Sequence, residues 1–192
     1  MSLFPIFVKI EGRAVLVVGG GTLAEAKVTA LLEAGAEVRV VSPEVSPAIR
    51  AWADSERIKW IERDFFATDA AGVVLVFAAT GRRKADRTVA ELARRFGVPV
   101  NAVDDPDFCD FYMPAIVRRG DLQIAISTNG HSPALAQQIR QRLEQEFSDD
   151  WTLRVSELGE RRRQIIASTE AGPERTEQLQ QIAREVMKEL LR

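Results

Sequence analysis

The feature that most constrains the fold is an apolar run that ends in a cluster of glycines. Ala14–Val18 is apolar and is followed at once by Gly19–Gly21. Helix-forming residues then occupy Leu23–Ala34, and Gly35 marks the end of that segment. Because glycine favours turns and ends helices, the run predicts a buried strand, a tight turn and a helix in that order.

The glycine turn has the spacing of a dinucleotide-binding motif. Gly19, Gly21 and Ala24 stand where that motif needs small residues, for a tight turn, close approach to a pyrophosphate and close helix–strand packing. The first amides of the helix are suited to binding phosphates. We therefore predict a dinucleotide cofactor bound at Gly19, Gly21 and Ala24. The alternative is that the glycines only make a turn in a fold of the same type.

Strand-like and helix-like segments alternate through the first half of the chain. The strand-like segments are Ala14–Val18, Val38–Val41, Ile58–Ile61, Val73–Phe77 and Val98–Asn101. The helix-like segments are Leu23–Ala34, Ser46–Trp52 and Lys84–Phe96. Continuous apolar strands separated by helices predict an α/β fold, with a Rossmann-like, doubly wound parallel sheet. In such sheets the ligand site lies at the carboxyl ends of the strands.

The pattern changes after Met113. Ala115–Arg119 and Leu122–Ser127 predict a β-hairpin, which alone is marginally stable and needs a further strand or a second copy of the chain. A helix is expected from Ser132, as its N-cap, to about Phe147. Amphipathic helical segments follow.

Composition excludes several classes of protein. A net charge of −2 over 192 residues gives no electrostatic reason to expect nucleic acid or a membrane as partner. No apolar run approaches the roughly 18 residues that a membrane span needs, and the N-terminus lacks the features of a signal peptide. Cys109 and His131 are the only cysteine and histidine, so we expect no structural metal site and an unreactive thiol. We expect a cytoplasmic protein.

The end of the second strand indicates which dinucleotide is bound. Ser42 stands where an acidic residue usually reads the adenosine ribose, and it can hydrogen-bond a ribose hydroxyl. Glu44 disfavours a 2′-phosphate by repulsion. NAD is therefore favoured, and NADP is left open. Ala79 and Thr80 follow the fourth strand and allow the cofactor to pass, although they also suit an ordinary turn.

Two loops carry candidate chemistry. Asn101 and Asp104 follow the fifth strand; Asp105, before Pro106, is interpreted as a turn residue or helix cap, which leaves Asp104 to face the cleft. Both Asn101 and Asp104 also suit a purely structural role.

The second loop joins the hairpin to a helix. The hydroxyls of Ser127, Thr128 and Ser132 and the helix N-terminus suit carboxylates of a ligand. His131 is either incidental or an acid, base or metal ligand.

Five segments in the same order carry a resemblance to a known family. They are Leu3–Phe7, the strand into Gly19–Gly21, Asn101–Pro106, Phe111–Ala115 and Ser127–Ala136. Together they resemble the precorrin-2 dehydrogenase family, which includes the N-terminal module of bacterial sirohaem synthase. The resemblance runs from about residue 3 to about residue 145, and the chain resembles the stand-alone form because it ends before a methyltransferase module.

The resemblance implies NAD-dependent oxidation of precorrin-2 to sirohydrochlorin, in sirohaem or cobalamin biosynthesis. It places the family's functional aspartate on Asp104, and cofactor contacts on Thr22, Leu23, Pro43 and Glu44. It also implies three parts: an NAD-binding Rossmann domain (1–113), a homodimerisation region of hairpin and helix (114–147) and a small helical domain (148–192).

Some family members also insert Fe²⁺ or Co²⁺ into the product. This chain has Asn129 where the family often has glycine, and His131 at a variable position, which leaves metal insertion open.

The tetrapyrrole substrate that the resemblance implies carries several carboxylates. Arginine binds carboxylates in bidentate fashion, and at most one of Arg118 and Arg119, and one of Arg140 and Arg142, can face it. The alternative for each is a solvated surface side chain. We assign substrate binding to Asn101, Arg118, Ser127, Thr128, His131 and Ser132. The rival functions are a regulatory domain that binds NAD without turnover, and a chelatase alone.

Overall fold

The computed structural model describes residues 3–190 of the chain. The chain divides into two compact units, one covering Phe4–Tyr112 and the other containing Leu3 and the residues from Met113 onward. Each unit is described by itself. Within the described residues, no helix combines the length and the apolar character needed to cross a membrane.

The first unit is built on a parallel sheet of five strands. They are β1 (Ala14–Val18), β2 (Glu37–Val41), β3 (Lys59–Ile61), β4 (Leu75–Ala78) and β5 (Val100–Ala102). Their order in the sheet is β3-β2-β1-β4-β5, so the chain reverses its direction of winding between β1 and β4. This is the switch point at which doubly wound sheets bind ligands.

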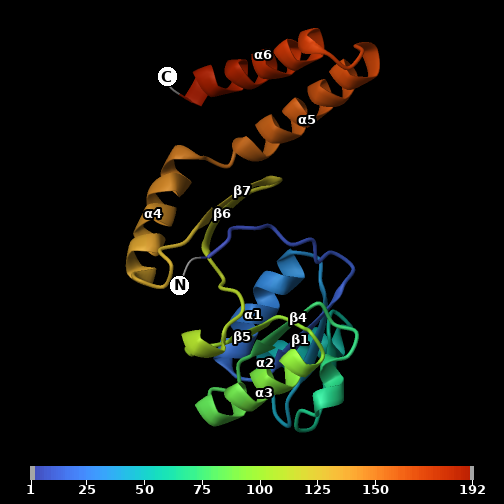
Figure 1. Cartoon of the computed structure of the whole chain (residues 1–192), viewed down its shortest axis with the longest axis vertical. Helices are drawn as coiled ribbons and strands as arrows, with labels where there is room; N and C mark the ends of the chain where they lie inside the picture. The colour runs from blue at the N-terminus through green and yellow to red at the C-terminus, as the bar shows by residue number, and fades with distance from the viewer. Residues whose placement is uncertain (1–2, 191–192) are drawn as a thin grey trace. The chain divides into compact units, whose positions relative to one another are not determined.

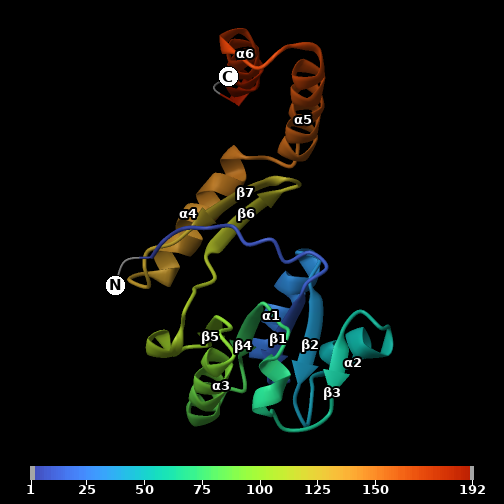
Figure 2. The same cartoon turned by 45° about the vertical axis from the view of Figure 1, so that its right-hand side comes forward.

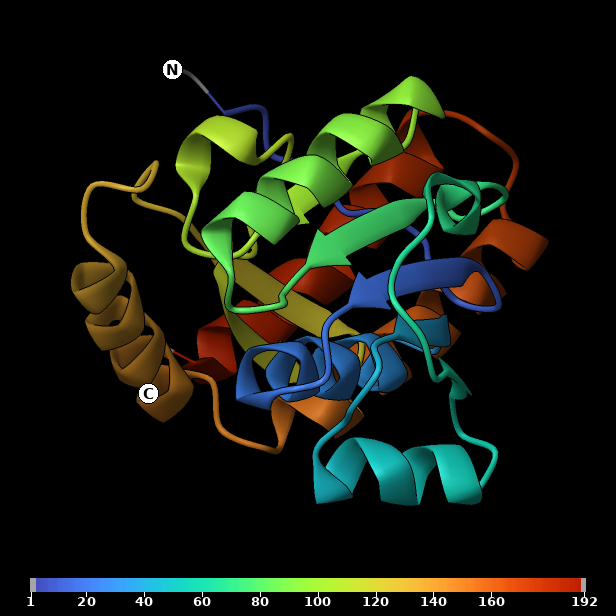
Figure 3. The same cartoon turned by 90° about the horizontal axis from the view of Figure 1, so that it is seen from below.

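Helices cover both faces of the sheet. The α-helices of this unit are α1 (Thr22–Glu33), α2 (Pro47–Asp54) and α3 (Arg83–Arg95), with 3-10 turns η1 (Ala67–Ala70) and η2 (Pro106–Phe108). Figure 1 labels them, and the view from below in Figure 3 shows α3 on one face and α1 and α2 on the other. The predicted Rossmann-like α/β fold is confirmed.

The core explains why the strands have no polar face. Successive strand residues point to opposite faces, and all of Val15, Leu16, Val17 and Val18 are at most 3% exposed. Leu16 and Val18 belong to the cluster packed around α3. A sheet covered on both sides therefore demands the continuous apolar runs that the sequence contains.

Element boundaries differ from the predicted ones mainly where strands are short. β3, β4 and β5 begin one or two residues later than predicted, and η1 was not predicted. Loop residues before these strands are apolar because they contribute to the core, as Val73 and Val98 do. Composition alone did not separate them from the paired residues.

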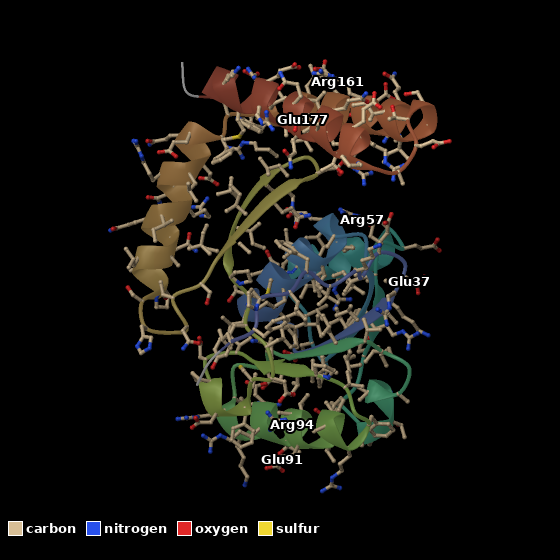
Figure 4. The ribbon with its side chains drawn as sticks, turned by 45° about the horizontal axis from the view of Figure 1, so that its top comes forward. Glu37, Arg57, Glu91, Arg94, Arg161 and Glu177 are labelled. Atoms are coloured by element: carbon tan, nitrogen blue, oxygen red, sulfur yellow. The ribbon has the colours of Figure 1, made fainter. Side chains whose placement is uncertain are left out.

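The second unit contains a β-hairpin and three helices. They are β6 (Ala115–Arg119), β7 (Leu122–Ile126), α4 (Pro133–Glu146), α5 (Trp151–Ser168) and α6 (Pro173–Leu190). The strands pair antiparallel, and α4 packs on the hairpin, as Figure 2 shows. α5 packs against α6. The predicted N-cap is confirmed, because Ser132 Oγ accepts the N–H of Leu135 at 3.2 Å. Figure 4 labels Arg161 on α5, whose guanidinium pairs with Glu185 of α6 at 2.7 Å.

Candidate cofactor and active site

The first two glycines of the turn are required by the protein's own packing. Gly19 has φ +123°, and a Cβ there would lie 2.2 Å from the carbonyl oxygen of Ala79. A Cβ on Gly20 would lie 1.9 Å from the carbonyl oxygen of Glu44. The loops after β2 and β4 therefore approach the end of β1 more closely than any side chain allows.

Gly21 has a different surrounding. It precedes α1 with φ −84°, a conformation open to any residue, and a Cβ on it would meet nothing within 4 Å. No packing constraint of the chain explains a glycine here. The open space in front of the helix N-terminus fits the close approach of a dinucleotide pyrophosphate, which the backbone amides and the helix dipole favour.

A cleft of about 700 Å³ lies at the carboxyl ends of β1, β2 and β4. Among the predicted cofactor residues, those that line it are Gly19, Gly21, Thr22, Ser42, Pro43, Glu44 and Thr80. Leu23 is exposed outside this lining, whereas Ala24 and Ala79 are buried behind it. Ala24 has the packing role that the motif gives its third small residue.

Ser42 shapes the turn after β2. Its hydroxyl donates to the carbonyl oxygen of Glu44 at 2.6 Å, and its own carbonyl oxygen accepts the indole N–H of Trp60 at 3.0 Å. The hydroxyl proton of Ser42 is therefore engaged in a hydrogen bond within the protein, while the carboxylate of Glu44 is exposed at the cleft. Glu44 and Asp64, both exposed, supply negative charge to the lining of this cleft.

The loop after β4 is held by a residue that the sequence analysis missed. Asp86 on α3 is 2% exposed, and its Oδ1 accepts the backbone N–H of Thr80 at 2.9 Å and the Thr80 hydroxyl at 2.8 Å. The signal available in the sequence was an aspartate in the first turn of a helix. Its partner was not deducible from that position.

Asp104 lies two residues after Ala102, the last residue of β5. Its carboxylate is exposed, and its backbone has φ +61°, in the left-handed region. It interacts electrostatically with Lys27, which is half-buried on α1. Burial lowers the pKa of Lys27, and the charge of Asp104 opposes that change. Lys27 was missed, although it follows the buried Ala24 by one helical turn and so shares its face.

The structure confirms part of the sequence interpretation of Asp105, because its carbonyl oxygen accepts the N–H of Phe108 at the N-cap position of η2. It directly precedes η2, but its side chain makes no capping hydrogen bond. It is 1% exposed, and its carboxylate accepts from Arg83 Nε at 3.0 Å and from Arg87 Nε at 2.6 Å. Hydrogen bonds from Arg83 and then Arg87 hold the pKa of Asp105 well below its usual range. Two guanidinium groups from α3 outcompete the local backbone for this carboxylate.

Asn101 and Cys109 tie the same segment together. Asn101 is buried in β5, and its Nδ2 donates to the carbonyl oxygen of Phe111 at 2.9 Å. The Cys109 thiol donates to the carbonyl oxygen of Ala102 at 3.1 Å, and burial raises its pKa. The structure thus gives Asn101 a structural contact and keeps Cys109 protonated, as expected for an unreactive thiol.

The remaining predicted residues lie in the second unit. Ser127 Oγ accepts the N–H of Asn129 at 3.1 Å, and Thr128 Oγ1 accepts the N–H of Ser132 at 3.0 Å. His131 is exposed on this loop, and Arg118 lies half-buried on β6. The structure therefore brings Ser127, Thr128, His131 and Ser132 together before α4. In the part of the chain that the structure describes, no group of three or more His, Cys, Asp or Glu residues is placed to hold a metal ion.

A doubly wound sheet with a glycine turn and a cleft at its switch point defines a dinucleotide-binding α/β protein. A family model described as putative NAD(P)-binding matches residues 6–115, and the chain belongs to this family. A second model, described as sirohaem biosynthesis protein central, matches residues 119–146. The predicted cofactor is thereby confirmed at the level of NAD(P).

Curated relatives include siroheme synthases. That of Methylococcus capsulatus is 45% identical and that of Neisseria meningitidis serogroup C is 43% identical, each over 144 residues. The match covers 75% of this chain, which spans only about 30% of the length of these relatives.

A solved structure described as SirC, precorrin-2 dehydrogenase, is similar along almost the whole chain. The TM-score is 0.72 at 26% identity, over 95% of this chain and 100% of that one. The family resemblance predicted from the sequence is confirmed.

Proposed function

We propose that this chain is an NAD-dependent oxidoreductase that oxidises precorrin-2 to sirohydrochlorin in sirohaem or cobalamin biosynthesis. The observation that carries the proposal is the similarity to a precorrin-2 dehydrogenase across both units of the chain. The two family models support it, since a putative NAD(P)-binding match is followed by a sirohaem-biosynthesis match.

Several residues of the first unit have separate roles in the proposed reaction. NAD, when bound, supplies the acceptor for the hydride. Gly21 and Thr22 provide the open backbone surface for its pyrophosphate, and Glu44 disfavours a 2′-phosphate. Asp104 accepts the proton, because it is an exposed carboxylate at the carboxyl end of β5. Lys27 on α1 interacts electrostatically with Asp104, so a basic side chain accompanies the proposed base.

Substrate carboxylates are assigned to the second unit. The backbone amides at the start of α4 directly follow Ser132 in the chain, and the N-terminus of a helix favours the binding of anions. Ser127, Thr128 and His131 are the side chains of the same loop, and Arg118 is a candidate bidentate donor on β6. Asn101 contributes by holding β5 to Phe111.

We also propose that the protein is a cytoplasmic homodimer that pairs through residues 114–147. α4 covers part of the hairpin, where Val117 is fully buried, but the two-stranded sheet keeps unpaired outer edges. Such edges pair readily with a second copy.

The test is turnover of precorrin-2 with NAD, followed by the absorbance of NADH and of sirohydrochlorin. Asp104→Asn should lower kcat by roughly 10²–10⁴-fold with NAD affinity unchanged, because it removes the base and keeps the size. Binding of NAD without NADH production would support a regulatory domain instead. A parallel assay with sirohydrochlorin and Fe²⁺ or Co²⁺, without NAD, decides whether a metal ion is also a substrate.

A further inference from the structure

Asp104 has a backbone conformation that residues other than glycine adopt rarely. Its φ of +61° lies in the left-handed region. Aspartate tolerates this region better than most residues, yet such a conformation persists only where the surrounding structure holds it. The direction of the Asp104 carboxylate therefore depends on what fixes its neighbours in the chain.

The residue on the carboxyl-terminal side is fixed by its side chain. The two carboxylate oxygens of Asp105 accept from Arg83 at 3.0 and 3.1 Å, and from Arg87 at 2.6 Å. The backbone N–H of Asp105 also donates to the carbonyl oxygen of Ala102 at 3.2 Å. With Val103 N–H bound to the carbonyl oxygen of Ala78, both flanks of Asp104 are held.

One of the two arginines, Arg87, is also held by an aromatic ring. The Arg87 guanidinium carbon lies 4.7 Å from the ring centroid of Phe108, at the end of η2. Arg87 thus lies against Phe108 while it binds the carboxylate of Asp105, and both contacts arise from one short segment after β5. We name Asp105, Arg83 and Arg87 the aspartate brace.

Stability alone gives a weak reason for such a brace. A buried ion pair often contributes no more stability than apolar residues of similar volume, whereas it restricts the chain to one local arrangement. Asp105 is among the largest fully buried side chains of the protein and directly follows the exposed Asp104. The position of Asp105 therefore suits a role in restricting the local backbone conformation.

We propose that Asp105 is a positioning residue: held by Arg83 and Arg87, it fixes the left-handed conformation of Asp104 and so the direction of its carboxylate. The inference rests on the proposed function of Asp104 as proton acceptor. Misplacement of a reacting group by about 1 Å can cost on the order of 10²-fold in rate. The brace therefore acts on kcat, while cofactor affinity is independent of it.

The chain offers a matched control on the same helix. Arg94, labelled in Figure 4, also pairs with a carboxylate, Asp110, at 2.8 Å, and lies 5.8 Å from the same Phe108 ring. Asp110 accepts the N–H of Val100, so this pair acts at the start of β5 and not at its end. Arg94→Gln removes a similar interaction without touching the brace.

The first measurement compares Asp105→Asn, Arg87→Gln and Arg94→Gln. We expect the first two to lower kcat at least about tenfold, with the Kd for NAD unchanged, and Arg94→Gln to stay within about twofold of the native kcat. Arg87→Gln keeps Arg83 on Asp105, so it remains informative if Asp105→Asn does not fold. Equal losses in Arg87→Gln and Arg94→Gln would overturn the proposal.

The second measurement is a double-mutant cycle. If Asp105 acts through Asp104, adding Asp105→Asn to Asp104→Asn causes no further loss of kcat. A full additional loss would mean a separate role for Asp105 and would overturn the positioning inference, while the role of Asp104 stood.

A third readout needs no turnover. The Cα and Cβ chemical shifts of residue 104 report its backbone conformation, and they should move in Asp105→Asn but not in Arg94→Gln. Unchanged shifts in Asp105→Asn contradict the brace even if Asp104 is the base. Near-normal kcat in Asp104→Asn, with shifts that do move, contradicts the proposed function of Asp104 and not the conformational brace.

Discussion

At the scale of single residues, neighbouring glycines have different reasons to be glycine. A side chain at Gly19 or Gly20 would collide with the backbone of adjacent loops, whereas one at Gly21 would enter open space. Substitution at the first two positions thus tests the fold, and substitution at Gly21 tests the cofactor.

Gly21→Asp should leave the fold intact and weaken NAD binding. Like charges about 4 Å apart repel by about 4 kcal/mol near a protein surface, so we expect the Kd to rise by roughly a hundredfold or more. Titration calorimetry measures it. Gly172→Asp is the control, because a Cβ there also meets nothing within 4 Å and the glycine lies in the other unit. An unchanged Kd in a folded Gly21→Asp variant would refute the cofactor placement.

Glu44→Gln should weaken the preference for NAD over NADP. The exposed carboxylate at the cleft repels the 2′-phosphate of NADP. Its removal should therefore lower the Kd for NADP divided by the Kd for NAD by roughly fivefold, or about 1 kcal/mol, at low salt. Glu37→Gln, at the start of the same strand and labelled in Figure 4, should leave the ratio unchanged. A ratio unaffected by Glu44→Gln would assign the selectivity to another residue.

At the scale of elements, the sequence predicted the alternation of strands and helices but not the contacts between them. The glycine turn and the apolar strands are local patterns, so their places and the sheet they form could be inferred. The Asp105 contacts join residues 18 and 22 positions apart, and Asp86 contacts a loop that precedes its own helix. Such pairings depend on where α3 lies on the sheet, which propensity and periodicity do not encode.

The contribution of Asp105 and its two arginines to the free energy of unfolding should depend on pH. Because hydrogen bonds from Arg83 and Arg87 lower the pKa of folded Asp105, unfolding takes up a proton at acidic pH. The stabilisation is therefore present above about pH 4 and is lost as the pH falls toward the folded pKa. Urea unfolding should show that Asp105→Asn destabilises the protein more at about pH 7 than at about pH 2.5. Equal destabilisation at both values would contradict this, and Asp121→Asn, an exposed aspartate between β6 and β7, is the control.

At the scale of the whole molecule, the hairpin of the second unit is the candidate site for pairing with a second copy of the chain. A two-stranded sheet with open edges is stable only with support, and α4 supports one side of the hairpin. The proposed homodimer would satisfy the strand edges and bring two copies of the loop before α4 into one assembly.

Sedimentation of the full chain tests this assembly. We expect a stable dimer at micromolar concentration, because two copies of the same hairpin can pair in a symmetric interface. A single monomeric species over that range would contradict the proposal. The cofactor placement would be unaffected, because its cleft is lined by the first unit alone.

The hydrogen bonds from Thr80 to Asp86 have a consequence for the kinetics of binding. They fix the loop after β4 through the protein's own side chains, so a dinucleotide can bind to this loop without first ordering it. Little conformational entropy is then lost at this loop on association. Different dinucleotides should therefore associate at similar rates, and their affinities should differ through how long each one stays bound.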